Sequence, residues 1–253
     1  MGRGLSIAGF IGISIVYLVI IQGFGKVLTA GIETEYAAPT SVDALWRSIS
    51  VPVFLSLLFV YAVVAVLGWW RPVFKDDKPV QRWLLVIPII MVVAIVIGTN
   101  WAGLVDRGPT FAGVLIVSTL MVGFAEEGMF RGIGVVAFRR NGSAEGKVAL
   151  WTCILFGLAH ATNIFTEGSK ALLQVLVTVV AGYFFYLIRR RSGGLVLAAI
   201  LHGFWDLGVI SGGVVPGKTY VGTALFILAD IVILVILLAR RRHIEPEVST
   251  AST

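Results

Sequence analysis

Long apolar stretches, separated by short polar connections, run along the whole chain. Three of them, residues 5–21, 49–70 and 83–103, contain no charged side chain. A helix needs about 20 mostly apolar residues to cross the hydrocarbon of a bilayer, and these stretches approach or reach that length. The pattern therefore predicts an all-α, polytopic bundle of about eight transmembrane helices, at residues 5–25, 49–70, 83–101, 110–137, 148–165, 171–188, 194–210 and 220–239.

The composition agrees with this pattern and excludes an ordinary soluble protein. Hydrophobic residues make up 58% of the chain and charged residues only 13%, whereas soluble domains carry about 25% charged residues. The one cysteine, Cys153, lies inside an apolar stretch. A single thiol cannot form a disulfide framework or a thiolate metal site, so we expect Cys153 to be a packing residue.

The chain shows no internal repeat and no separate soluble domain. We predict one transmembrane domain over residues 1–242 and a disordered cytoplasmic tail over residues 243–253, in which His243 is solvated. The first apolar stretch could instead be a signal peptide that is cleaved near Ala30. It is longer than the usual apolar region of about 7–15 residues in signal peptides, so we expect it to be retained.

Basic residues alternate between the two sides of the predicted membrane. Fourteen lysines and arginines fall in connections on one side and five on the other. Because positive residues favour the cytoplasmic face, the pattern predicts a multi-pass protein of the cell membrane with both termini in the cytoplasm. The basic excess follows the topology and therefore does not indicate nucleic-acid binding. It can also attract anionic lipid, by about 1 kcal/mol per residue near the surface.

Ionisable residues inside the predicted spans are few and concentrated. A charge in the hydrocarbon costs about 2.5–3.5 kcal/mol on insertion scales and usually marks function. At about 1.5 Å per residue, Glu126, His160 and His202 lie roughly 15–18 Å below the cytoplasmic boundary, although they come from three different helices. Such a layer must face inward around a wet cavity. The ionisable residues are Glu126, Glu127, Arg131, His160, His202, Asp206 and Asp230.

Spacing within the helices suggests which of these side chains meet. Glu127 and Arg131 are four residues apart and can pair on one helical face, either as a structural ion pair or in support of chemistry. Glu126 points about 100° away from Glu127. His202 and Asp206 are also four apart. For Asp230 we expect a second contact to Arg131 or a polar helix contact, and no catalytic role.

These side chains suggest hydrolysis by activated water. A carboxylate and an imidazole that face one cavity can deprotonate water, and a ring N–H of His202 can stabilise the resulting oxyanion. Ser118 and Cys153 each lie two turns from the nearest candidate base, which argues against a covalent nucleophile. Two histidines and a glutamate could instead hold zinc, although the local H-E-x-x-H spacing is absent. We expect no cofactor and keep zinc as the alternative.

Three motifs in this region resemble those of a known family. Residues 126–131 read Glu-Glu-Gly-Met-Phe-Arg and resemble an EExxxR motif, residues 156–160 resemble FxxxH, and residues 202–206 resemble HxxxN or HxxxD. The order and spacing resemble those of the CPBP family, also called Abi, which groups CAAX prenyl proteases with bacteriocin-processing enzymes. The resemblance covers about residues 110–210.

The resemblance implies an eight-helix intramembrane endopeptidase similar to the eukaryotic Ras-converting enzyme. It implies that Glu126 and His160 activate water and that His202 and Asp206 hold the oxyanion. Glu127, Arg131 and Phe156 would support the site, in a glutamic rather than a metal-dependent mechanism. Asp206 departs from the asparagine of the prenyl-protein enzymes. An ionised carboxylate cannot donate a hydrogen bond, so Asp206 is either protonated or orients His202.

The expected partner is a peptide or protein substrate associated with the membrane, and the cavity is expected to open toward the cytoplasm. Two other functions compete with hydrolysis. The first is a non-catalytic scaffold or regulator of another membrane protein. The second is a proton-coupled transporter, which is less favoured because the chain lacks the repeat symmetry that transporters commonly show.

Overall fold

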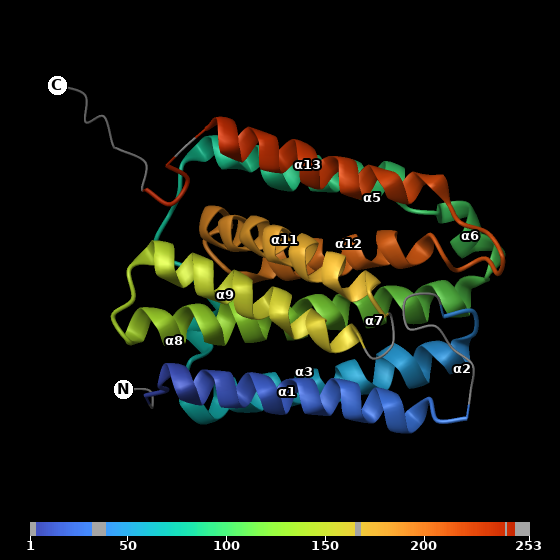
Figure 1. The fold of residues 1–253 in the computed structure, drawn as a ribbon, viewed down its shortest axis with the longest axis horizontal. Coiled ribbons are helices and arrows are strands. Elements are labelled where there is room, and N and C mark those ends of the chain that lie inside the picture. The colour runs from blue at the N-terminus through green and yellow to red at the C-terminus, as the bar shows by residue number, and fades with distance from the viewer. Residues whose placement is uncertain (1–3, 32–38, 165–167, 241, 246–253) are drawn as a thin grey trace.

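The computed structural model describes residues 4–31, 39–164, 168–240 and 242–245. These residues form helices and contain no β-strand, so the predicted all-α class is confirmed (Figure 1). The main helices are α1 (Ile7–Leu28), α2 (Val42–Leu45), α3 (Val51–Leu67), α4 (Trp70–Phe74), α5 (Val86–Gly98), α6 (Trp101–Asp106), α7 (Pro109–Glu127), α8 (Val135–Arg140), α9 (Glu145–Ala159), α11 (Lys170–Ser192), α12 (Leu195–Ser211) and α13 (Ala224–Ala239).

Short segments of tighter or wider helix join several of these elements. Two are π-helical, η1 (Trp46–Ser50) and η3 (Gly128–Gly134), and three are 3₁₀-helical, η2 (Arg82–Leu85), η4 (His160–Asn163) and η5 (Val221–Thr223). The segments η1 and η3 extend their neighbours into long continuous helices. The segment η3 overlaps the last four residues of the EExxxR motif, residues 128–131, and π-helical turns occur frequently at functional sites.

Five helical segments among the described residues are long and apolar enough to cross a membrane. They are Ile7–Leu28, Val42–Leu67, Pro109–Arg140, Ala171–Ser192 and Val221–Ala239, and Arg82–Gly98 and Leu195–Ser211 are shorter apolar helices. These helices and the family resemblance of the site region support a membrane protein. The described residues of each of the eight predicted spans lie mostly in helix, but the number of crossings and the orientation of the termini stay predictions.

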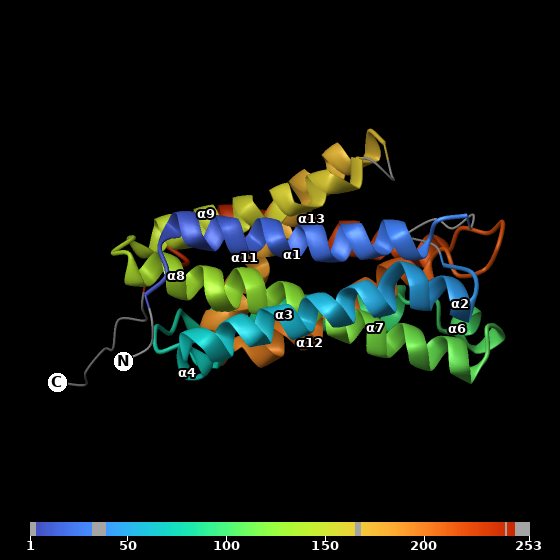
Figure 2. The same ribbon diagram turned by 90° about the horizontal axis from the view of Figure 1, so that it is seen from below.

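The long helices lie side by side in successive layers (Figures 1 and 2). The helix α12 packs against α7 on one side and α5 on the other, and α13 packs against α5. The helices α1 and α3 pack together on the far side of α7, and α9 packs along α11. Large apolar side chains such as Ile15 and Val19 on α1 and Ile227 and Leu238 on α13 are exposed, as expected for surfaces that face lipid.

Glycine lets α7 and α12 approach each other closely. A Cβ atom on Gly123 would lie 2.1 Å from the carbonyl oxygen of Ala199, and one on Gly203 would lie 2.7 Å from the carbonyl oxygen of Thr119. Helices in lipid associate mainly by van der Waals packing, so small residues at the interface stabilise the pair. This contact matters for function because α7 carries Glu126 and α12 carries His202.

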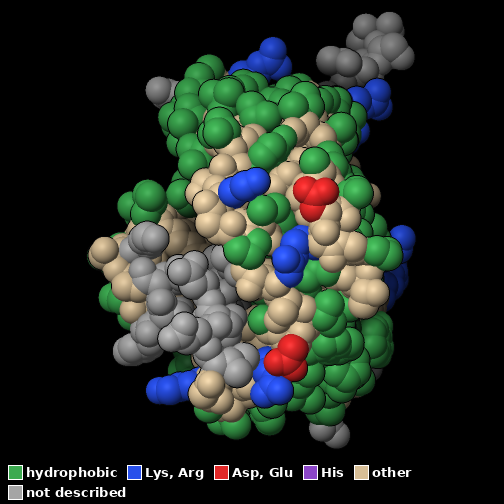
Figure 3. Space-filling model, turned by 90° about the vertical axis from the view of Figure 1, so that its right-hand side faces the viewer, with side chains coloured by type: hydrophobic (Ala, Val, Ile, Leu, Met, Phe, Trp, Pro, Cys, Tyr) green, Lys and Arg blue, Asp and Glu red, His purple; other side chains and the backbone are tan. Residues whose placement is uncertain are grey.

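One end of the bundle carries most of the basic residues, and we call it the basic end. It contains α4, the turn between α8 and α9, the turn between α11 and α12, and the last turn of α13. The other end, which holds α2 and α6, shows only scattered Lys and Arg side chains (Figure 3). The asymmetry in basic residues expected from the sequence is therefore present in three dimensions.

Several arginines at the basic end are occupied by internal contacts, which differs from the expected free surface charge. Arg189 is fully buried, and its Nε donates to Asp76 Oδ2 at 3.0 Å. Arg139 binds both Asp76 and Glu145. Arg190 is buried and donates to the carbonyl of Lys78 at 2.7 Å. These arginines fasten the connections together, so fewer of them remain to attract anionic lipid.

His243 is not solvated as expected for the start of a disordered tail. Its Nδ1 lies 3.1 Å from the hydroxyl of Tyr183, and its ring packs edge-on against Trp83 at 6.0 Å. Ile244 packs against the core, and its carbonyl accepts from Arg190. The ordered part of the chain therefore continues at least to residue 245, and the rest of the predicted tail, residues 246–253, lies outside the described residues.

The close contact between α7 and α12 leads to a test of stability. We expect Gly123→Ala to lower the melting temperature in detergent by several degrees, because the new methyl group meets the backbone of α12. The matched control is Gly113→Ala on the same helix, where nothing lies within 4 Å of a Cβ atom. The control should be neutral or slightly stabilising, since alanine favours helix. Equal melting temperatures for the two variants would contradict this account.

Candidate active site

The Glu126 carboxylate lies between the two membrane-embedded histidines. Its Oε2 atom is 3.6 Å from His202 Nε2 and 4.0 Å from His160 Nε2. This atom is buried and has no hydrogen-bond partner among the described residues. Three elements far apart in the sequence, α7, η4 and α12, therefore bring one carboxylate and two imidazoles to a single point. The expected convergence is observed.

The end of α9 orients His160. The helix changes from α to 3₁₀ geometry at this residue. Its Nδ1 lies 3.0 Å from the carbonyl oxygen of Phe156, one turn earlier. A carbonyl can only accept, so Nδ1 carries the proton and Nε2 of the neutral ring is left as an acceptor that faces Glu126. The Phe156 ring also packs edge-on against His160, with centroids 4.9 Å apart.

Glu127 and Phe185 orient His202. The Nδ1 of His202 donates to Glu127 Oε1 at 3.0 Å, and the ring stacks on Phe185 with centroids 4.6 Å apart. Glu127 is fully buried and also pairs with Arg131, whose Nη1 lies 3.1 Å from the same oxygen. The predicted ion pair therefore forms, and it has a second function that the spacing did not reveal. It fixes which nitrogen of His202 is protonated.

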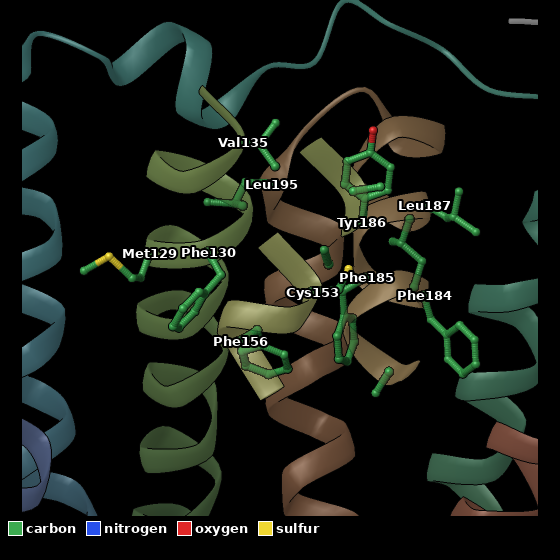
Figure 4. Close-up of a cluster of buried hydrophobic side chains, with 14 of the residues drawn as sticks. Met129, Phe130, Val135, Cys153, Phe156, Phe184, Phe185, Tyr186, Leu187 and Leu195 are labelled. Atoms are coloured by element: carbon green, nitrogen blue, oxygen red, sulfur yellow. The ribbon is translucent and has the colours of Figure 1, made fainter. Parts of the chain in front are cut away.

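The Arg131 guanidinium is enclosed by an aromatic ring and by a glycine of a neighbouring helix. It is fully buried, and its Cζ atom is 4.0 Å from the centroid of the Phe156 ring. Gly182 on α11 provides the remaining space, because a Cβ there would come within 2.4 Å of Arg131 Nη2. Such a cation–π contact stabilises a desolvated arginine. Figure 4 shows Phe156 and Phe185 in the aromatic cluster that surrounds this region.

Asp206 lies beside the same histidine on the cavity side. Its Oδ2 atom is 3.6 Å from His202 Nε2, too far for a direct hydrogen bond. Asp206 lines the cavity together with Glu126 and His160. The carboxylates of Glu126, Glu127 and Asp206 thus surround the His202 ring.

The site opens into a cavity of about 270 Å³. Residues on its wall include Val122 on α7 and Val209 and Ile210 on α12, which lie at or beyond the level of Glu126 toward the end opposite to the basic end. Tyr17 and Phe130, which lie nearer the basic end than Glu126, also line the cavity. The opening of the cavity toward the cytoplasm stays a prediction.

Several residues considered from the sequence lie away from this point. Cys153 is buried in the hydrophobic core, as expected. Ser118 Oγ bonds to Ser50 and to the carbonyl of Val114. Within the described part of the chain, Asp230 forms no ion pair and its buried Oδ1 has no hydrogen-bond partner, so it does not contact Arg131. Neither the Ser118 hydroxyl nor the Cys153 thiol therefore joins the site.

Three neutral amides on the cavity wall were missed by the sequence reasoning. Gln22, Asn163 and Gln174 line the cavity that contains Glu126. A search for ionisable residues overlooks uncharged amides. The available signal was the presence of Gln22, Asn163 and Gln174 inside predicted apolar spans, where side-chain amides need partners.

Among the described residues, no group of three His, Cys, Asp or Glu side chains is arranged to hold a metal ion. The two Nε2 atoms and Glu126 Oε2 are the donors that would have to rearrange to bind one. The arrangement as it stands brings together a proton acceptor on His160, a carboxylate on Glu126 and a ring of His202 held by a second carboxylate.

Comparisons with known proteins agree with the motifs. Residues 108–208 match the Rce1-like family model, described as type II CAAX prenyl endopeptidase Rce1-like. No curated protein and no solved structure matches the chain. The matched region contains Glu126, His160, His202 and Asp206, and the resemblance to the CPBP family is confirmed. Over residues 108–208, the chain is therefore similar to the Rce1-like CAAX-type endopeptidases.

Proposed function

We propose that the protein is an intramembrane endopeptidase that hydrolyses a peptide bond with water activated by Glu126 and His160. The observation that carries the proposal is the position of Glu126 Oε2, which faces the Nε2 atoms of both histidines at 3.6 and 4.0 Å beside a cavity. The family match supports a protease of the CAAX type in general. The residue roles that follow are our own assignment.

Water activation uses the gap between Glu126 and His160. A distance of 4.0 Å is too long for a direct hydrogen bond, but one water molecule can bridge two such groups. In that position the water donates one proton toward Glu126 and the other toward His160 Nε2, which is an acceptor because Nδ1 holds the proton. Glu126 takes a proton as general base, and the water oxygen attacks the substrate carbonyl.

The tetrahedral intermediate requires a donor for its oxyanion, and we assign this role to His202. Its Nδ1–H is bound to Glu127, so Nε2 carries a hydrogen only when the ring is a cation. The carboxylates around the ring stabilise that cation, and its Nε2–H then donates to the oxyanion. Asp206 assists either as a protonated second donor or by holding the His202 cation. When the intermediate collapses, Glu126 returns its proton to the leaving amine.

The substrate class follows from the walls of the cavity. Apolar residues such as Leu18, Ile21 and Val122 surround the polar site, and the whole cavity lies among helices that face lipid. We propose a peptide or protein segment that is associated with the membrane, without a requirement for prenylation. The alternative of a non-catalytic scaffold predicts that the same face binds a partner without cleaving it.

The first prediction concerns the two residues that activate water. We expect Glu126→Ala and His160→Ala to lower the cleavage rate of a fluorogenic peptide library in detergent by at least about 10²-fold, because general base catalysis contributes about 10²–10⁴-fold. The control is Glu245→Ala, at an exposed glutamate outside the site. Melting temperatures close to that of the wild type show that the fold is intact. Full activity in either site variant, or genetic complementation by Glu126→Ala, would favour the scaffold.

The second prediction concerns Glu127, which contacts His202 and not the cavity. We expect Glu127→Gln to lower kcat by about a hundredfold or more, because the neutral amide no longer stabilises the His202 cation and can present the wrong atom to Nδ1. KM should change little. The matched control is Asp43→Asn. This substitution also removes a carboxylate that pairs with an arginine four residues later, but the Asp43–Arg47 pair is exposed. A rise in KM at unchanged kcat would refute this role.

The third prediction distinguishes activated water from a metal mechanism. We expect dialysis against EDTA followed by 1,10-phenanthroline to leave activity within about twofold, and added zinc to give no increase. Elemental analysis of the purified protein should find less than about one-tenth of a metal ion per chain. If activity is lost and zinc restores it, the two histidines and Glu126 are metal ligands and the proposed water activation is wrong.

A further inference from the structure

A row of three side-chain amides follows the cavity wall beside the site. Gln22 Nε2 on α1 donates to Asn163 Oδ1 at 2.9 Å, and Asn163 Nδ2 donates to Gln174 Oε1 on α11 at 2.9 Å. Gln22 Nε2 also donates to the Thr162 hydroxyl at 3.0 Å. The row joins α1 to the ends of α9 and α11, which lean away from the rest of the bundle in Figure 2.

Each end of the row carries an unused hydrogen-bonding group. Among the described residues, neither the acceptor Gln22 Oε1 nor the donor Gln174 Nε2 has a hydrogen-bond partner. Neither belongs to the buried atoms that lack partners, and both side chains are half-buried and line the cavity. The row therefore leaves one acceptor and one donor without a partner among the described residues, on two side chains that line the cavity.

An extended peptide carries the complementary groups. Each residue of its backbone offers one N–H donor and one C=O acceptor. In an apolar cavity these groups need partners, because an unsatisfied amide away from water is costly. The other walls supply few neutral polar groups, since residues such as Ile21, Ile49 and Val209 are hydrocarbon.

We propose that Gln22, Asn163 and Gln174 form a subsite that binds the backbone of the substrate peptide on the side of Glu126 away from the basic end. The inference rests on the proposed function and adds the side of Glu126 on which the peptide lies. Side-chain amides bind backbone rather than a particular side chain, so the subsite positions the peptide without selecting its sequence. Specificity then comes from the apolar walls.

A purely structural role makes a different prediction. If the amides only fastened α1 to α9 and α11, their removal would lower stability and leave peptide binding unchanged in the folded protein. If they bind the peptide, their removal weakens binding whether or not stability falls. The two roles are separated by measuring both quantities on the same variants.

The experiment measures peptide capture without turnover. Full-length Glu126→Ala protein in detergent is irradiated with a mixed-sequence octapeptide library that carries p-benzoylphenylalanine and biotin. Gln22→Met and Gln174→Met are added singly to this background. The matched control is Gln81→Met, which removes an amide that bonds only to the Trp83 indole outside the cavity.

We expect crosslinks on α1 near Gln22 and on α11 near Gln174, and a loss of about tenfold in crosslinking yield in the two cavity variants but not in Gln81→Met. Unchanged yields in Gln22→Met and Gln174→Met, crosslinks only at the basic end, or no saturable crosslinking would each overturn the proposal. The crosslinking results are independent of cleavage because the background lacks Glu126. If the wild-type protein binds the captured peptide but does not hydrolyse it, the protease is refuted and the subsite stands.

A second measurement applies if the methionine variants do not fold. The most strongly captured octapeptide is resynthesised with an ester in place of each backbone amide in turn, which removes one N–H donor at a time. We expect one or two positions to lose about tenfold in affinity for the Glu126→Ala protein. Equal affinity for every ester variant would overturn the subsite.

Discussion

The site depends on one buried carboxylate, that of Glu127, which is shared between a cation and an imidazole. Arg131 neutralises it from one side at 3.1 Å, and His202 donates to it from the other at 3.0 Å. A buried charge without partners would cost several kcal/mol, so these three groups must assemble together. Once assembled, they leave the Nε2 atom of His202 directed at Glu126. The chemistry at Glu126 therefore rests on a neighbour that does not face the cavity.

Backbone geometry allows this assembly to form inside a bilayer. Glycines at positions 123 and 203 bring α7 and α12 close enough for the Glu127–His202 hydrogen bond, and Gly182 leaves room for the arginine. The wide turn η3 follows directly after Glu127 and carries Arg131. Each of these features would be a weakness in an ordinary helix, because glycine and π turns cost stability. Here they place two charged groups where the hydrocarbon alone would exclude them.

The cavity and the amide row indicate the side from which a peptide would approach Glu126. Much of the cavity wall, including Gln22, Val122 and Gln174, lies on the side of Glu126 away from the basic end. A peptide that enters there would pass Gln22 and Gln174 before its carbonyl reaches Glu126. In this arrangement Glu126, His160 and the proposed backbone subsite line one cavity, and His202 contacts Glu126 from behind its wall. Hydrolysis and substrate binding then rely on different residues, which allows each to be tested without the other.

The sequence by itself determined the membrane class, the helical segments and the polar layer. The length of an apolar stretch and the depth of a residue below the membrane boundary depend on positions along the chain, so both can be counted from the sequence. The three motifs also identified Glu126, His160, His202 and Asp206 as one group, and helical spacing predicted the Glu127–Arg131 pair. Tertiary structure alone decided the contact between Glu127 and His202, the shape of the cavity and the amide row. These features depend on how helices rotate and approach each other, and that is set by packing between residues far apart in the chain.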